Sequence, residues 1–216
     1  MKQPFLLASV VHAPHQAVGG VAFGLGDFGR REDYIERQLK RWHTQFEKSR
    51  SREIPAVDEV YEELRRTVPE QGAATIVHGD YRLDNTMLGD DGHVRAVLDW
   101  EICTLGDPMA DVGLLTVYWA DPGDTLSALL LAPTALDGFP RRSEIAERYA
   151  ERSGRDLSRL DYYVAFGYWK LACILEGVYA RYKAGHAGGD RGAFDAFGDH
   201  VVVLAEAARD AVAAQS

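Results

Sequence analysis

The segment most informative about the fold is residues 73–101, AATIVHGDYRLDNTMLGDDGHVRAVLDWE. Its first eight residues, 73–80, form a short apolar run that predicts a buried strand leading into a loop. Two further runs, Thr86–Leu88 and Val94–Leu98, flank the segment GDDG at 89–92, which has the residues that tight turns prefer. We therefore predict a strand, a loop and then an antiparallel hairpin.

Three polar side chains are spaced along this frame in a way that suits the transfer of a phosphoryl group. Such a transfer needs a carboxylate that orients the attacking hydroxyl and accepts its proton, and hard oxygen ligands that hold magnesium against the phosphates. Asp80 follows the predicted strand, Asn85 precedes the first half of the hairpin, and Asp99 follows the second half. Because the two halves run antiparallel, we expect Asn85 and Asp99 to lie side by side and to bind one metal ion.

The pattern H-x-D-x4-N at residues 78–85, with Asp99 after it, matches the signatures of the kinase catalytic loop and metal-binding segment. The forms HGD and DWE, together with GDPMAD at 106–111, resemble the aminoglycoside phosphotransferase and choline kinase-like family. Finer detail, including GRREDYIERQLKRW at 29–42, is similar to the branch that occurs alone in bacteria or fused to acyl-CoA dehydrogenases. The resemblance runs from about residue 20 to the C-terminus and is most specific over 75–115.

The resemblance implies a role for each residue of the motif. Asp80 would be the catalytic base, and Asn85 and Asp99 would bind the Mg²⁺ ion that accompanies the ATP co-substrate. Arg82 lies two residues after the base, where its guanidinium would stabilise the transferred phosphoryl group; a surface ion pair is the alternative. Asp111 would accept N–H hydrogen bonds from the backbone of the catalytic loop, which is a structural role.

Other polar residues near the motif have simpler interpretations. His78 is expected to pack and hydrogen-bond beneath the loop, as structural support rather than as an acid or base. Asp84 and Glu101 are expected to be solvated or to lie behind the metal ligands. Asp107 is expected to cap the helix that follows it.

Most of the remaining sequence predicts helices, by the spacing of its apolar residues. They are expected over 31–49, from Pro55 to about Val68, from Pro108 to about Trp119, and over about 141–153, 158–184 and 190–213. Helices on both sides of a small β element are not the regular alternation of a doubly wound fold. The predicted fold class is therefore α+β and mostly helical, and the resemblance implies the C-terminal lobe of a protein kinase-like fold.

The helix predicted over 158–184 is rich in aromatic residues, which at helical spacing favours a buried core over a substrate pocket. Glu176 differs from its neighbours, because an acid between Leu175 and Gly177 in an apolar helix needs a partner. We treat Glu176 as a candidate contact for the substrate.

The amino-terminal part shows no recognisable ATP-binding lobe, which would carry a glycine-rich loop and a strand lysine. Only 77 residues precede His78, and Lys40 and Lys48 fall on the first predicted helix. Residues 24–29 fit G-x-G-x-x-G, but they lead straight into a charged helix, so we reject them as a nucleotide loop. We expect the ATP lobe to be absent, with the chain divided into a connecting segment (1–30) and a kinase-like lobe (31–216) that comprises the catalytic-loop region 75–111 and a helical substrate-side region 112–216.

The composition is that of an ordinary globular protein, with 46% hydrophobic and 26% charged residues. A net charge of −9 argues against a nucleic-acid partner, which would require a basic surface. The two cysteines, Cys103 and Cys173, form no zinc or disulfide pattern, which favours a cytoplasmic location. The apolar run at 5–11 is too short for a signal peptide, and no stretch is long enough to span a membrane.

Three hypotheses follow for the function. The leading one is the transfer of the γ-phosphoryl group of ATP to a hydroxyl of a small molecule, by a chain that is truncated and impaired on its own. The alternative is a non-catalytic kinase-like binding module that forms a homodimer through the surface left by the ATP lobe. The third is a metal-dependent phosphohydrolase using His78, Asp80 and Asp99, which would need ligands for a second metal that the sequence does not offer.

Overall fold

The structure is a computed structural model that describes residues 29–185 and 191–215. Helices predominate and the strands are short, so the mostly helical α+β class predicted from the sequence is confirmed. The predicted helices are found with their ends shifted by a few residues, as is usual for boundaries read from a pattern. The elements are α2 (Tyr34–Ser49), α3 (Pro55–Arg66), β1 (Thr75–Val77), η1 (Leu83–Asn85), β2 (Thr86–Leu88), β3 (Val94–Val97), β4 (Thr104–Gly106), α4 (Met109–Tyr118), η2 (Pro133–Ala135), α5 (Arg142–Ser153), α6 (Leu160–Lys183) and α7 (Arg191–Ala213).

The described residues divide into two compact units. One, here called the strand unit, comprises residues 29–34 and 71–160, and the other, the helix unit, comprises 35–70 and 161–215. We expected a single lobe over 31–216, whereas two stretches distant in sequence combine to form the helix unit. The predicted connecting segment 1–30 and the rejected glycine motif lie almost wholly outside the described residues.

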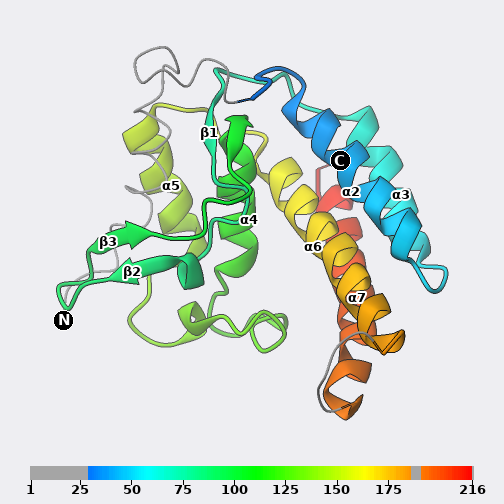
Figure 1. Cartoon of the computed structure of the whole chain (residues 1–216). Helices are drawn as coiled ribbons and strands as arrows, with labels where there is room; N and C mark the ends of the chain where they lie inside the picture. The colour runs from blue at the N-terminus through cyan, green and yellow to red at the C-terminus, as the bar shows by residue number, and fades with distance from the viewer. Residues whose placement is uncertain (1–28, 186–190, 216) are drawn as a thin grey trace. The chain divides into compact units, whose positions relative to one another are not determined.

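The strand unit contains two antiparallel strand pairs, and both are drawn in Figure 1. The predicted hairpin is confirmed as β2 and β3, with Thr86 opposite Val97 and an irregularity between Met87 and Leu88. The strand predicted over 73–80 shortens to β1, which pairs with β4 in the register Val77 to Thr104. We did not predict β4, because a strand of three residues is too short to show an alternating pattern.

Gly106 ends β4 at a point where no side chain fits. A Cβ atom on Gly106 would lie 2.2 Å from Cδ2 of Tyr34, which is closer than van der Waals contact allows. Helix α4 begins three residues later and is buried from Met109 to Val117. The glycine thus lets β4 pass close to an aromatic ring and deliver the chain directly into the buried helix.

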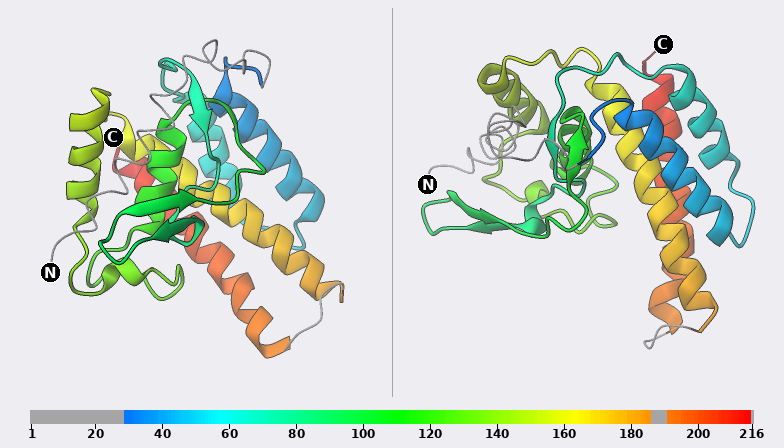
Figure 2. Two further views of the ribbon diagram at one scale, coloured as in Figure 1. Left: turned by 60° about the vertical axis from the view of Figure 1, so that its left-hand side comes forward. Right: turned by 45° about the horizontal axis from the view of Figure 1, so that its top comes forward.

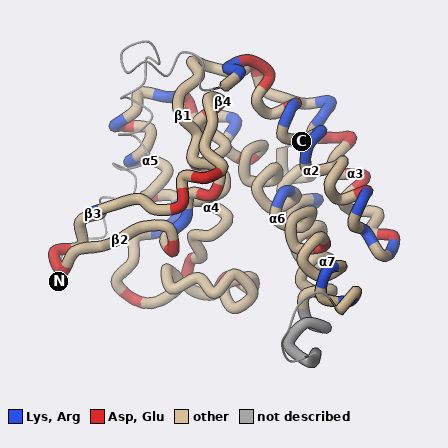
Figure 3. The backbone as a smooth tube through the Cα atoms, in the orientation of Figure 1, with Lys and Arg blue, Asp and Glu red and all other residues tan. Residues whose placement is uncertain are grey.

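The helix unit is built from α2, α3, α6 and α7, which run alongside one another in both views of Figure 2. The aromatic residues of α6 between Tyr162 and Trp169 are buried, which confirms the prediction that they form core, whereas Tyr179 and Tyr182 are half-buried. Two of these aromatic residues also form hydrogen bonds: the Tyr162 hydroxyl donates to the Leu64 carbonyl at 2.9 Å, and the Trp169 indole N–H donates to the Val57 carbonyl at 2.9 Å. Basic and acidic residues are interspersed along α2 and α3 in Figure 3.

The segment 119–141 joins α4 to α5 by turns, whereas we predicted a helical region from residue 112 onward. Side-chain hydrogen bonds hold its ends in place: Trp119 Nε1 donates to the Pro140 carbonyl at 2.9 Å, and Thr134 Oγ1 donates to the Ala120 carbonyl at 3.0 Å. Arg142 Nη2 pairs with Asp124 at 2.7 Å. The segment therefore has a defined course, although η2 is its one short helix.

Among the described residues, no helix combines the length and the apolar character that crossing a bilayer requires.

Candidate active site

The backbone of the loop 78–85 is anchored by one buried carboxylate. Asp111, in the first turn of α4, is 1% exposed; its Oδ2 accepts the N–H of His78 at 2.7 Å and its Oδ1 accepts the N–H of Gly79 at 2.9 Å. Gly79 has φ +86°, a conformation that glycine adopts without strain. The carboxylate and the glycine together define how the chain turns out of β1 and into the loop.

His78 links this loop to the end of β3. The side chain is 2% exposed, and its Nδ1 lies 3.2 Å from the backbone N of Asp80 while its Nε2 lies 2.8 Å from the Leu98 carbonyl. These contacts suit a neutral ring that accepts at Nδ1 and donates at Nε2. The ring centroid also lies 4.7 Å from that of Trp100. With both nitrogens engaged, His78 has a structural environment and no nitrogen left for a metal.

The side chains of Asp80 and Asn85 meet within the loop. Asn85 Nδ2 donates to the Asp80 carbonyl at 2.8 Å and to Asp80 Oδ2 at 3.1 Å. The carbonyl of Asn85 accepts the N–H of Leu98 at 2.8 Å, so Asp99 follows directly on the residue paired with Asn85. The structure therefore joins the side chains of Asp80 and Asn85, and the backbone pairing places Asp99 one residue after the position that faces Asn85.

The donor atoms of Asn85 and Asp99 fit a magnesium ion. Because Asn85 Nδ2 is held by Asp80, its amide oxygen is directed elsewhere, and no hydrogen bond occupies that oxygen among the described residues. The exposed Asp99 carboxylate likewise has no ion pair or hydrogen bond within the described part of the chain. Asp99 also has φ +62°, a conformation that is rare outside glycine and recurs at ligand-binding positions. Uncommitted amide and carboxylate oxygens are the ligands that Mg²⁺ prefers.

Arg82 lies in the same loop, between two partners. Its Nη2 forms an ion pair with Asp84 Oδ2 at 2.5 Å, and its Cζ lies 4.7 Å from the centroid of the Tyr118 ring. Burial lowers the pKa of the Arg82 guanidinium, but the nearby Tyr118, Asp84 and Asp80 outweigh burial and raise it. Arg82 Nε is buried and has no hydrogen-bond partner in the described structure. The guanidinium is therefore charged, and because the side chain is 32% exposed, its accessible part can donate to a further oxygen.

Tyr118 is a residue of this site that we did not predict. It is the last residue of α4, and burial raises the pKa of its phenol, as does the charge of Asp80, while Arg82 acts in the opposite direction. The Tyr118 ring thus lies beside the Arg82 guanidinium, and the charge of Asp80 acts on its phenol. The sequence did contain a signal, because Tyr118 lies seven residues after Asp111 and hence on the same face of the helix.

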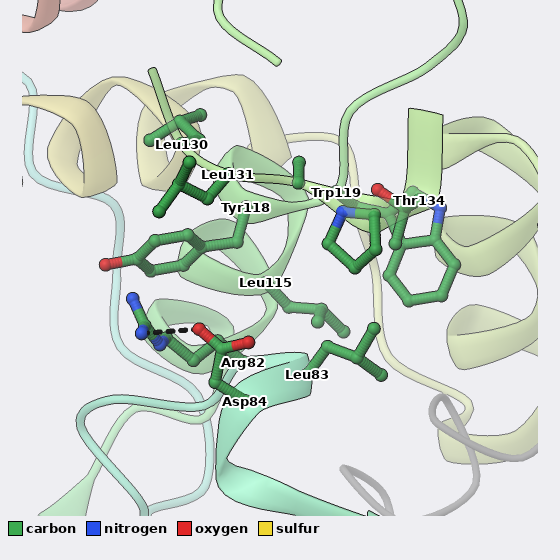
Figure 4. A pocket seen from close by; sticks show the side chains of 11 residues that line it. Arg82, Leu83, Asp84, Leu115, Tyr118, Trp119, Leu130, Leu131 and Thr134 are labelled. Carbon is green, nitrogen blue, oxygen red and sulfur yellow. Dashed lines mark ion pairs between the residues drawn. The ribbon is translucent and has the colours of Figure 1, made fainter. Parts of the chain in front are cut away.

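A small pocket opens beside Arg82 and Tyr118 (Figure 4). Its enclosed volume is about 10 Å³, which is room for about one water molecule. Apart from the ion pair of Arg82 and Asp84, its walls are mainly apolar and come from the loop, from α4 and from the segment 119–141. The lining residues are Arg82, Leu83, Asp84, Leu115, Tyr118, Trp119, Leu130, Leu131, Ala132, Pro133 and Thr134.

Glu176 lies in the helix unit, in an environment different from the substrate contact that we expected. It is 0% exposed; its Oε1 accepts the backbone N–H of Ser51 at 3.0 Å and the Ser51 hydroxyl at 3.3 Å. Its Oε2 lies 3.6 Å from Arg52. The partner that this buried acid needs is thus the turn between α2 and α3, which it holds in place.

The remaining polar residues of the motif lie near the loop or the helix that follows it. Asp84 is exposed and paired with Arg82, and Glu101 is exposed. Asp107 is 2% exposed and its Oδ1 accepts the N–H of Met109 at 3.0 Å, so the prediction that it caps α4 is confirmed.

One other group of side chains in the described structure could share a metal ion. His43, Glu47 and Asp58 of the helix unit have ligand atoms within 4.8 Å of one another. Arg50 already neutralises the two carboxylates, at 3.1 Å from Glu47 and 3.2 Å from Asp58. No such group joins His78 to Asp80 and Asp99 in the described residues, which disfavours the two-metal phosphohydrolase hypothesis.

Comparison by sequence relates this chain to phosphotransferases. Residues 7–163 match the phosphotransferase enzyme family, APH. The chain is 36% identical over 170 residues to acyl-CoA dehydrogenase family member 10 of Mus musculus, covering 77% of this chain and 16% of that protein. It is 33% identical over 171 residues to family member 11 of Rattus norvegicus, covering 76% and 22%. The chain therefore spans between 16% and 22% of the length of these two relatives.

Comparison with solved structures also relates this chain to phosphotransferases. A protein from Ralstonia eutropha JMP134, provisionally named an aminoglycoside phosphotransferase, matches with a TM-score of 0.82 and 33% identity. The match covers 97% of this chain and 64% of that one. The macrolide 2′-phosphotransferase of Brachybacterium faecium matches with a TM-score of 0.57 and 19% identity, over 93% of this chain and 59% of that one, and this second likeness is one of fold alone.

Proposed function

The chain belongs to the phosphotransferase enzyme family, and on that premise we propose that it transfers the γ-phosphoryl group of ATP to a hydroxyl group of a small molecule. The observation that carries the proposal is the contact between the side chains of Asp80 and Asn85, in a loop whose backbone is held by Asp111. A phosphotransferase needs such a preorganised group of oxygens, since its catalysis is mainly positioning and neutralisation of charge.

In this proposal Asp80 acts as the base. The oxygen of the acceptor hydroxyl attacks the γ-phosphorus of ATP, and the bond from that phosphorus to the β,γ-bridging oxygen breaks. The electron pair of the broken bond leaves with ADP, and the hydroxyl proton passes to a carboxylate oxygen of Asp80. The hydrogen bond from Asn85 Nδ2 to Asp80 Oδ2 orients that carboxylate for the transfer.

Asn85 and Asp99 would hold magnesium and Arg82 would contact the transferred phosphoryl group. When bound, Mg²⁺ neutralises phosphate charge and orients the phosphates. The Arg82 side chain is 32% exposed, so the accessible part of its charged guanidinium would donate to a phosphoryl oxygen. We assign no substrate role to Glu176, because its carboxylate is buried against Ser51 and Arg52.

The acceptor is proposed at the level of chemical class. Aminoglycosides, choline-like alcohols, sugars and hydroxyacyl thioesters all present a hydroxyl to such a site. The relatives named as acyl-CoA dehydrogenase family members favour a metabolic alcohol over an antibiotic, by analogy alone. Since the chain spans only part of each relative, the activities of the whole relatives are not carried over to it.

A second candidate function is a non-catalytic interaction module of the same fold, including a homodimer. The observation that favours it is a set of exposed apolar side chains on and beside the hairpin, at Met87, Leu88, Leu98 and Ile102. Such a module would bind a protein partner or a second copy and would form no phosphoester.

The test of the proposed function is ³¹P NMR of the full-length protein with Mg-ATP and a panel of hydroxyl compounds from the four classes above. We expect ADP to appear together with a new phosphomonoester resonance from one class, and both to vanish when EDTA removes magnesium. Folded protein that forms no phosphoester with any class, but self-associates in light scattering, would instead support the interaction module.

A further inference from the structure

Helix α4 contacts the loop 78–85 at two points that lie on one face. Asp111, in its first turn, binds the backbone of His78 and Gly79. Tyr118, seven residues later, lies against the guanidinium of Arg82. One helix therefore supports both the backbone of the loop and the cation that the loop carries.

Without Tyr118, the orientation of Arg82 would depend on an exposed partner. Its ion pair is with Asp84, whose side chain is 63% exposed, and exposed pairs constrain a long side chain only weakly. The Tyr118 ring, with its centroid 4.7 Å from Arg82 Cζ, is fixed at the end of a buried helix. Figure 4 shows the ring extended over the guanidinium, with its hydroxyl on the side of the charged group.

We propose that Tyr118 is a positioning residue, which holds the Arg82 guanidinium against the loop 78–85 so that a donor of Arg82 can meet the transferred phosphoryl group. The proposal rests on the phosphotransfer proposed above, because it names the residue that orients one of its catalytic groups. The ring supplies a cation–π contact, and the phenol oxygen supplies an acceptor beside the guanidinium.

The interactions of the phenol with its surroundings agree with this role. Burial is the main cause that raises the pKa of the Tyr118 phenol; Arg82 lowers this pKa, and the charges of Asp80 and Asp84 raise it further. Tyr118 and Arg82 also line the same small pocket, where they face the apolar segment that includes Leu130 and Leu131. Because the Arg82 guanidinium lies at the wall of so small a pocket, its N–H groups can point in few directions.

The direct test is the order of the Arg82 side chain, measured by ¹⁵N relaxation of its Nε–Hε group in the full-length protein. We expect an order parameter of about 0.8 in the wild type, a fall below about 0.6 in Tyr118→Leu, and an intermediate value in Tyr118→Phe, which keeps the ring. The matched control is Tyr179→Leu, which removes a similar ring 5.1 Å from Arg52 in the helix unit and should leave Arg82 unchanged. An Arg82 group that remains ordered in Tyr118→Leu overturns the proposal.

Kinetics supply the second readout. Tyr118→Leu is expected to lower kcat by about 10- to 100-fold with less than about a threefold change in the KM for ATP, and Tyr118→Phe to restore part of that loss. When Arg82 is already replaced by Lys, adding Tyr118→Leu should lower kcat by less than a further factor of about three, because the guanidinium that Tyr118 positions is no longer present. If the kcat of the double variant falls by the product of the two single-variant losses, the two residues act independently and the proposal is overturned. If the wild type transfers no phosphoryl group, the proposed function fails, and the NMR measurement still decides whether Tyr118 positions Arg82.

Discussion

Asp80→Asn is expected to lower the turnover of the full-length protein by about 10²- to 10⁴-fold, because an amide cannot accept the proton of the acceptor hydroxyl. The substitution changes the chemistry and little else. The amide oxygen of Asn at this position can still accept the hydrogen bond from Asn85 Nδ2, and the backbone contacts of residue 80 with His78 and Asn85 are kept. Steady-state phosphotransfer with the acceptor found in the ³¹P NMR assay gives the ratio of turnover rates.

The control for this experiment is Asp90→Asn, which removes one negative charge from the exposed turn between β2 and β3. It should change turnover by less than about twofold, since surface charges at a distance from a site act weakly at physiological salt. Circular dichroism should show both variants folded. An Asp80→Asn protein with the turnover of the wild type would remove Asp80 from the role of base.

Asp111→Ala is expected to lower the free energy of unfolding by about 3–5 kcal/mol, because it leaves two backbone N–H groups without their charged acceptor in a buried place. Asp111 is 1% exposed, and the two N–H groups belong to His78 and Gly79. The loss should appear as a lower urea midpoint, and any change in the slope of the transition would indicate that the loop has loosened in the native state.

Asp161→Ala provides a matched comparison, since Asp161 also lies in the first turn of a helix, α6, but is exposed. This substitution should lower the free energy of unfolding by less than about 1 kcal/mol, which is the usual contribution of a surface carboxylate near a helix N-terminus. Equal destabilisation by the two substitutions would show that the buried hydrogen bonds of Asp111 contribute nothing beyond a helix-terminus effect.

The parts of the fold that the sequence predicted are those with strong local signals. The turn residues at 89–92 between two apolar runs predicted the β2–β3 hairpin, and the apolar spacing predicted the helices. Strand β4 was missed because its three residues are stabilised by pairing with β1, a partner far away in the sequence. The segment 119–141 was missed for a similar reason, since hydrogen bonds to Pro140 and Ala120 hold it rather than a periodic pattern.

The residues of the candidate site also separate into those with a local sequence signal and those whose contacts depend on distant parts of the chain. Asp80 and Asn85 are five residues apart, so a motif at fixed spacing was enough to single out both, and the structure shows that their side chains are in contact. Tyr118 required the three-dimensional arrangement, because its seven-residue spacing from Asp111 indicates a shared helix face but not its contact with Arg82. Glu176 shows the opposite error: its burial was inferred correctly from its apolar neighbours, but its partner, the turn at Ser51 and Arg52, lies more than a hundred residues away in the sequence.

Asn85 and Asp99 are proposed to bind one divalent ion beside Asp80, and paramagnetic line broadening by Mn²⁺ can detect that ion at these residues. Mn²⁺ replaces Mg²⁺ at oxygen sites and broadens the NMR signals of nearby nuclei. In the ¹⁵N-labelled protein, we expect the side-chain amide of Asn85 and the backbone amide of Asp99 to broaden first, and excess Mg²⁺ to restore both. Signals of Asn85 and Asp99 that stay sharp while those of His43 and Asp58 broaden would contradict the claim.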